Sequence, residues 1–131
     1  MIVLDASVLI AHLDARDSHH ESAVELLRAH STELLGASQI SLAETLVAPA
    51  RAGRLEEARE ALERIAVREL APGPAASPRL ASLCAETGLK LPDCCVLLTA
   101  QEHHGGVASF DQDLCRSARD LGIPVATRIR H

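Results

Sequence analysis

The stretch Met1-Ile-Val-Leu-Asp-Ala-Ser-Val-Leu9 opens the chain with an apolar run that ends in a carboxylate at Asp5. Residues 2–5 are predicted to form a short buried strand, and a helix with Ser7 as its cap is expected to follow. Asp5 then stands at the carboxyl end of a strand, where parallel α/β sheets build their ligand sites. These first residues therefore predict an α/β fold with an acidic group at the edge of its sheet.

Three more carboxylates stand in comparable places along the chain. Glu44 and Asp93 open apolar, helix-like runs, and Asp111 directly follows a predicted strand. Asp113 lies two residues further on, and one of the two is expected to cap the last helix while the other is free for chemistry. Asp111 is the preferred ligand because it is adjacent to the strand end. Several converging carboxylates, without a competing His or Cys cluster, describe a site for a hard cation such as Mg²⁺ or Mn²⁺.

Each of these acids also has a purely structural interpretation. Asp5 could cap the helix that follows its strand, and Glu44 fits a capping box that begins at Ser41. Asp93 follows Pro92 in a first helical turn, where the helix dipole favours negative charge. We expect function rather than capping because the acids would meet at the rim of one sheet.

Predicted strands and helices alternate along the rest of the chain. Further strands are expected at residues 34–40, 67–70, 107–110 and 123–129, the last at a sheet edge because it contains Pro124. Helices are expected at about residues 18–30, 41–53, 55–66, 77–87, 94–103 and 112–121. This alternation predicts a parallel sheet covered on both faces, and the length suits a single domain over residues 1–131.

The composition excludes several classes of protein. Apolar residues make up 47% of the chain, but Phe110 is the only aromatic residue, so the core must be aliphatic and base stacking on an aromatic platform is not expected. This argues against modules of the RRM or OB type. The net charge of −5 argues against a surface that coats nucleic acid. No apolar run reaches membrane-spanning length and none resembles a signal peptide, so a cytoplasmic protein without membrane contact is expected.

Soft-metal sites are not predicted by the Cys and His residues. The cysteines form no C-x-x-C pair, so zinc and thioredoxin-like interpretations fail, and reduced thiols are expected. The pairs His19-His20 and His103-His104 would point about 100° apart on a helix, which suits solvated helix faces better than chelation. Arg51 and Arg54 could meet a substrate phosphate or could be plain surface charges.

Four segments of the chain, in this order, resemble the PIN-domain family and specifically its VapC-type toxins. The segments are Val3-Leu-Asp-Ala-Ser-Val-Leu9, Ser41-Leu-Ala-Glu-Thr-Leu46, Leu91-Pro-Asp-Cys-Cys-Val-Leu97 and Ala108-Ser-Phe-Asp-Gln-Asp113. The resemblance runs from Ile2 to about Val125. It places the family's acidic quartet on Asp5, Glu44, Asp93 and Asp111 and its small hydroxyl residues on Ser7 and Ser109. Ala6 stands where many members carry Thr.

The resemblance implies a three-layer α/β/α sandwich with a parallel five-stranded sheet in the order 3-2-1-4-5. It also implies a ribonuclease that uses Mg²⁺ or Mn²⁺, held by Asp5, Asp93 and Asp111, with Glu44 acting as a ligand, through water if not directly, or orienting the attacking water. Asp113 is a further candidate ligand, and Ser7 and Ser109 are candidate substrate-binding residues. The implied partners are a second copy of the chain, an RNA substrate and a small antitoxin whose other end binds operator DNA.

Functions of other classes remain open at this point. A catalytically silent module with the same fold, which binds RNA or a protein, is compatible with every residue above. A receiver-like domain needs a buried lysine late in the chain, but Lys90 is the only lysine and precedes Asp93. A phosphatase of the Asp-x-Asp type needs a second Asp where this chain has Ser7.

Overall fold

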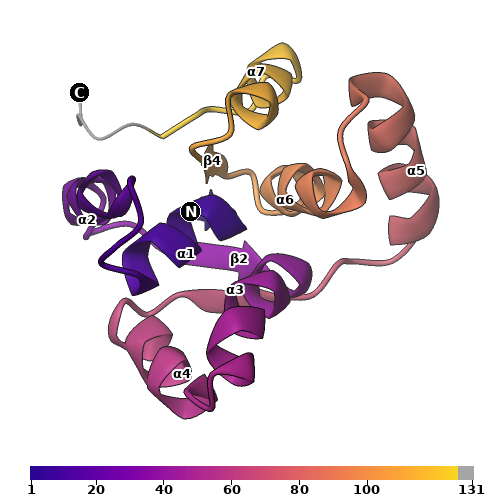
Figure 1. Ribbon diagram of the computed structural model, residues 1–131. Coiled ribbons are helices and arrows are strands. Elements are labelled where there is room, and N and C mark those ends of the chain that lie inside the picture. The colour runs from indigo at the N-terminus through magenta and orange to yellow at the C-terminus, as the bar shows by residue number, and fades with distance from the viewer. Residues whose placement is uncertain (127–131) are drawn as a thin grey trace.

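The computed structural model describes residues 1–126 as a parallel four-stranded sheet between two layers of helices (Figure 1). The strands are β1 (Ile2–Leu4), β2 (Leu35–Ser38), β3 (Arg68–Leu70) and β4 (Gly106–Ala108). The helices are α1 (Ala6–Leu13), α2 (His20–Ala29), α3 (Gln39–Arg51), α4 (Leu55–Arg64), α5 (Ala76–Thr87), α6 (Leu91–Glu102) and α7 (Gln112–Asp120). The predicted α/β sandwich with a parallel sheet is confirmed.

The strand order is β3-β2-β1-β4, as predicted for the first four strands. In the central strand, Val3 pairs with Gly36 of β2 on one side and with Val107 of β4 on the other. The fifth strand, predicted at residues 123–129, lies partly outside the described residues. Within them it is a single parallel bridge between Val107 and Val125, on the free edge of β4 where that strand was expected.

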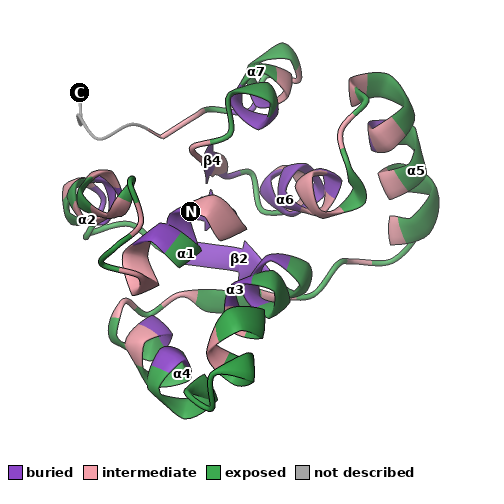
Figure 2. Cartoon of the chain, in the orientation of Figure 1, coloured by how far each residue is buried: buried purple, intermediate pink, exposed green. Residues whose placement is uncertain are grey.

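Two aliphatic clusters cover the two faces of the sheet, because alternate residues of β1 point to opposite sides. Ile2 and Leu4 belong to the cluster under α1, α2 and α4, and Val3 belongs to the cluster under α5, α6 and α7. Figure 2 shows that α6 is largely buried, whereas α4 and α5 expose most of their surface. The carboxyl ends of β1 and β4 therefore open at a rim that is flanked by the buried helix α6.

The predicted helix starts at Ser18 and Ser41 are wrong. Helix α2 begins at His20 without a side-chain cap. Helix α3 begins at Gln39, because Ser38, the last residue of β2, is its N-cap and its Oγ accepts the N–H of Ser41 at 3.2 Å. Strand β2 runs into α3 without a loop, so the cap falls three residues before the expected one. Ser41 consequently lies buried inside the helix.

Glycines shape the ends of two helices and one strand contact. Gly53 and Gly88 follow α3 and α5 with φ near +71° and +73°, a conformation that glycine adopts without strain. A Cβ at Gly36 of β2 would lie 2.6 Å from Leu70 Cδ1 of β3, so a larger residue there would require the Leu70 side chain to move. No helix within residues 1–126 combines the length and the apolar character that crossing a membrane requires.

Candidate active site

Asp5 is the most buried acid of the predicted quartet, with only 5% of its surface exposed. It ends β1 and is the N-cap of α1, so the prediction that Ser7 caps this helix is wrong. Asp5 Oδ1 accepts the Val8 N–H at 3.1 Å and the Ser7 hydroxyl at 2.6 Å, and Oδ2 accepts the Ser109 hydroxyl. Capping and a functional position therefore coincide at this residue.

The hydroxyls of Ser7 and Ser109 join the ends of β1 and β4. Ser7 Oγ accepts the N–H of Phe110 at 3.0 Å, and Ser109 Oγ accepts the N–H of Asp111 at 2.9 Å. The Asp5 N–H also donates to the carbonyl oxygen of Ala108 at 3.1 Å. Both serines were predicted to bind substrate, but in the structure their hydroxyls hold the carboxylate of Asp5.

The alternative between Asp111 and Asp113 is resolved in favour of Asp111 as the cap of α7. Asp111 Oδ1 accepts the N–H groups of Asp113 at 2.9 Å and Leu114 at 3.1 Å. Asp113 is exposed and pairs with Arg116 one turn further along the helix, at 3.0 Å. Asp111, preferred from the sequence as the free acid, is thus the cap, and it lies beside Ser109 at the strand end. Both Asp111 and Asp113 are exposed.

Glu44 and Asp93 come from two helices that pack against each other, α3 and α6. Glu44 is exposed and, because Ser41 is buried inside the helix, it forms no capping box. Asp93 is half-buried in the first turn of α6, as predicted, and Pro92 precedes it within that turn. These two side chains approach the rim from helices rather than from strands.

The pKa shifts of Asp5 and Asp93 indicate that the four acids lie near enough to interact. The pKa of Asp93 is raised by burial and then by the charges of Asp111, Asp5 and Glu44, and Lys90 offsets this only in part. Burial also raises the pKa of Asp5, against the opposing effect of its hydrogen bonds, and the charge of Asp111 adds to the increase. Each acid of the quartet thus acts on Asp93, and a cation would relieve their mutual repulsion.

The donor atoms of this cluster suit a hard divalent cation, since they are carboxylate and hydroxyl oxygens. Among residues 1–126, no three Asp, Glu, His or Cys side chains stand close enough together to hold a metal ion unaided. Mg²⁺ commonly keeps several water molecules and uses only one or two carboxylates directly. The residues therefore fit an ion that is held partly through water.

Cys94 adds no soft ligand to the site, although it follows Asp93 in the chain. It is fully buried, and its Sγ lies 3.1 Å from Cys84 Sγ of α5. Burial, together with the contact to Cys84, raises the pKa of Cys94 to about 12. The residue is a neutral thiol that packs in the core as a small hydrophobe.

Comparison with known proteins places the fold in a family. The PIN domain model matches residues 2–120. The chain belongs to the PIN domain family. A comparison with curated proteins found no match for this PIN domain.

Solved structures resemble this PIN domain over almost their whole length. A toxin–antitoxin complex from Klebsiella pneumoniae is 25% identical, with full coverage of both chains and a TM-score of 0.76. VapC20 from Mycobacterium tuberculosis, described as a Sarcin-Ricin loop cleaving toxin, is 18% identical, with full coverage of both chains and a TM-score of 0.75. FitAB bound to a DNA fragment is 21% identical and covers 100% of this chain and 99% of the other, with a TM-score of 0.76.

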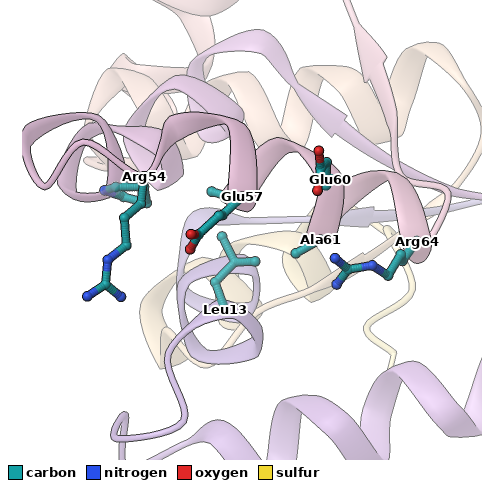
Figure 3. Close-up of a pocket in the computed structure, with 8 residues that line it drawn as sticks. Leu13, Arg54, Glu57, Glu60, Ala61 and Arg64 are labelled. Carbon is teal, nitrogen blue, oxygen red and sulfur yellow. The ribbon is translucent and has the colours of Figure 1, made fainter.

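The arginines proposed from the sequence lie where α3 ends and α4 begins, with Arg51 as the last residue of α3 and Arg54 as the residue before α4. Arg54 lines a pocket of about 430 Å³ with Leu13, the last residue of α1 (Figure 3). Leu13 is roughly 12 Å along the helix from Asp5 at its other end. Arg51 is exposed in the last turn of α3, roughly 10 Å along that helix from Glu44. Their role in binding substrate stays a prediction.

One aromatic contact of the PIN domain was missed from the sequence. The ring of His19 stacks on Phe110, with centroids 4.7 Å apart and an interplanar angle of 13°. His20 was expected on a solvated face, but its Nδ1 lies 2.7 Å from the carbonyl oxygen of Ala11. His103 and His104 are exposed as predicted. One feature of the sequence could have drawn attention to Phe110: it is the sole Phe, Trp or Tyr of the chain and directly precedes Asp111.

Proposed function

We propose that this PIN domain is a divalent-metal-dependent endoribonuclease that acts as the toxin of a toxin–antitoxin pair. The observation that carries the proposal is that burial, and then the charges of Asp111, Asp5 and Glu44, raise the pKa of Asp93 at the rim of the sheet. Carboxylates crowded in this way are poorly suited to stability alone, because each repels the others. They suit a site that is completed by a cation.

The cation, Mg²⁺ or Mn²⁺, would be held by Asp5, Asp93 and Asp111, in part through water. When bound, it would stabilise negative charge on the phosphate and make a water molecule more acidic. Ser7 and Ser109 keep Asp5 in place through its two oxygens. Glu44, which is exposed, would act as a further ligand or orient the attacking water.

The products follow from the nature of the nucleophile. Water, rather than the 2′-hydroxyl of the RNA, attacks the phosphate, and the bond from phosphorus to the 3′-oxygen breaks. The upstream fragment should therefore leave with a 3′-hydroxyl, and the downstream fragment should carry a 5′-phosphate. The net charge of −5 does not oppose binding of RNA, because the bound cation supplies positive charge where the phosphate lies.

The proposed partners are a small antitoxin and a second copy of the chain. Support comes from the similar solved structures, which include toxin–antitoxin complexes and complexes bound to DNA. Ile40 and Val47 of α3 and Leu55 of α4 are exposed apolar residues that a partner could cover. Operator DNA would be bound only through the antitoxin, and the protein would act in the cytoplasm.

The deciding experiment is cleavage of RNA by the purified protein with Mg²⁺ or Mn²⁺, compared with chelator. Cleavage that requires the cation, leaves 5′-phosphates and disappears in Asp5→Asn supports the proposal. The alternative function is a catalytically silent PIN-like module that binds RNA or a protein. Binding of RNA without cleavage at any divalent-metal concentration, by protein that is folded, would favour that module instead.

The partner proposals need separate tests. Sedimentation at micromolar concentration should show a dimer, and a monomer would contradict that proposal. Co-expression with the neighbouring reading frame should allow a small protein to co-purify. Recovery of the PIN domain alone would contradict the antitoxin proposal and leave the ribonuclease proposal standing.

A further inference from the structure

Each residue of the His19–Phe110 stack is held through its backbone N–H, which donates to an oxygen of a nearby side chain. The Phe110 N–H donates to Ser7 Oγ at 3.0 Å, and the Ser7 hydroxyl donates to Asp5. The ring of Phe110 is half-buried against the aliphatic cluster under α1. Phe110 is therefore held by the same hydrogen bonds that hold the acidic rim, and its neighbour in the chain is Asp111.

His19 forms the outer layer of this stack. Its N–H donates to Asp17 Oδ1 at 2.8 Å, which orders the turn before α2. The His19 side chain is nevertheless 55% exposed. A planar ring has two faces, and Phe110 covers one of them, so the exposed surface includes the opposite face. An aromatic face backed by a fixed ring is the kind of surface on which proteins stack bases of single-stranded nucleic acid.

We propose that His19, supported from behind by Phe110, stacks a nucleobase of single-stranded RNA next to the phosphate that is cut. This inference rests on the proposed function and extends it to a substrate contact. It revises the expectation from composition that no aromatic platform exists, since the sole aromatic residue gains a second ring from a residue far away in the sequence. His19 is a binding residue in this proposal and takes no part in the chemical step.

The platform can be tested with a fluorescent base. The probe is a pool of single-stranded oligoribonucleotides, randomised on both sides of one 2-aminopurine, whose fluorescence falls when the base stacks. The chain contains no Trp or Tyr, so the protein adds little to this signal. Binding should quench the probe with wild type and with His19→Phe, which keeps the stack. Quenching should be lost with His19→Ala and reduced with Phe110→Leu, which preserves an apolar side chain but removes the supporting ring.

Kinetics distinguishes binding from catalysis. His19→Ala should raise KM about tenfold, equal to about 1.4 kcal/mol, and should leave kcat close to wild type, because the contact is made equally before and during the reaction. Such a loss is in the range found when stacking side chains are replaced by alanine. His103→Ala removes an exposed histidine at the other end of α6 from Asp93 and should change neither quantity.

The results that would contradict the stacking proposal differ from those that would contradict the ribonuclease proposal. If His19→Ala quenches the probe and cleaves RNA with the KM of wild type, the inference is wrong. It is also wrong if that variant only lowers the melting temperature, since the stack would then be purely structural. If wild type quenches the probe through His19 but cleaves nothing, the ribonuclease proposal falls and the platform stands.

Discussion

The two sides of the acidic rim are built in different ways. On the strand side, both oxygens of Asp5 accept hydrogen bonds, and Asp111 caps α7 beside Ser109. On the helix side, no residue of the range 1–126 forms a hydrogen bond with the side chain of Glu44 or Asp93. Those two are placed only by the backbones of α3 and α6, which pack on each other. The difference predicts that a bound cation would find the strand side already oriented and would itself have to orient the helix side.

The largest effect is expected from a single change on the helix side. Asp93→Asn should lower cleavage of RNA by well over a hundredfold, because it removes a ligand that no other residue replaces. The loss should exceed the roughly 10–100-fold that follows the loss of an outer-shell partner. Steady-state cleavage assays measure it. The matched control is Asp113→Asn, also in a first helical turn but paired with Arg116, which should remain near wild-type activity. Activity of Asp93→Asn close to that of wild type would place Asp93 outside the site.

A smaller loss is expected when the support on the strand side is removed. Ser109→Ala takes one hydroxyl from the buried carboxylate of Asp5 and also removes the acceptor for the Asp111 N–H. Activity should fall about 10–100-fold, on the scale of outer-shell partners, and higher cation concentration should restore part of it. Ser82→Ala, at an exposed position of α5, is the control. Wild-type activity in Ser109→Ala would mean that the hydrogen bonds do not orient Asp5 for catalysis.

Binding of the cation by acids from both sides of the rim should stabilise the fold. At ten times its Kd, Mg²⁺ or Mn²⁺ should add about 1.4 kcal/mol to the free energy of unfolding, because the site is absent in the unfolded chain. Thermal unfolding followed by circular dichroism, with and without chelator, measures this. Asp93→Asn should respond much less than wild type. A melting temperature that does not move in wild type, together with no heat of binding in calorimetry, would contradict the metal site.

The smallest effect is expected in the pH dependence of the metal-free protein. Burial and charge raise the pKa of Asp5 and Asp93 in the folded state, so the folded state holds protons that the unfolded state has released. Stability from these groups is therefore fully present below about pH 4, the ordinary pKa of Asp, and is lost as the pH rises through the raised folded values.

In Asp93→Asn, the loss of stability with rising pH should be smaller than in wild type. The free energy of unfolding of the variant should exceed that of wild type by an amount that grows towards neutral pH and reaches roughly 0.2–1 kcal/mol, the scale of solvent-screened charge pairs. Loss of the helix-dipole interaction, about 0.3–1 kcal/mol, is common to Asp113→Asn, which isolates the effect of the acidic cluster. Urea denaturation at several pH values measures the differences. A pH profile of Asp93→Asn parallel to that of wild type would mean that the acids do not interact with Asp93.

Local pattern was enough for much of the fold. The apolar run before Asp5, the helical stripe that became α4 and the glycines after α3 and α5 were all placed correctly from neighbouring residues. Helix starts were less accurate, because the sequence of Ser41 to Glu44 matches a capping box. Only the direct junction of β2 with α3 decides that Ser38 is the cap. A capping pattern identifies residues that are able to cap, whereas the start of the helix depends on where the sheet ends.

The sequence by itself placed Asp5 and Asp111 after strands and Asp93 in a first helical turn, because strand and helix patterns are set over a few residues. Only the tertiary structure placed Glu44 in the second turn of α3 and decided the long-range contacts of the site. The Ser109 hydroxyl reaches Asp5 across 104 positions of the chain, and His19 meets Phe110 from the turn before α2. Such contacts arise when β1 and β4 become neighbours in the sheet, and no local preference of either residue encodes them. The acids of the candidate site are therefore recognisable in the sequence, whereas the hydrogen bonding of the strand side and its absence on the helix side are properties of the fold.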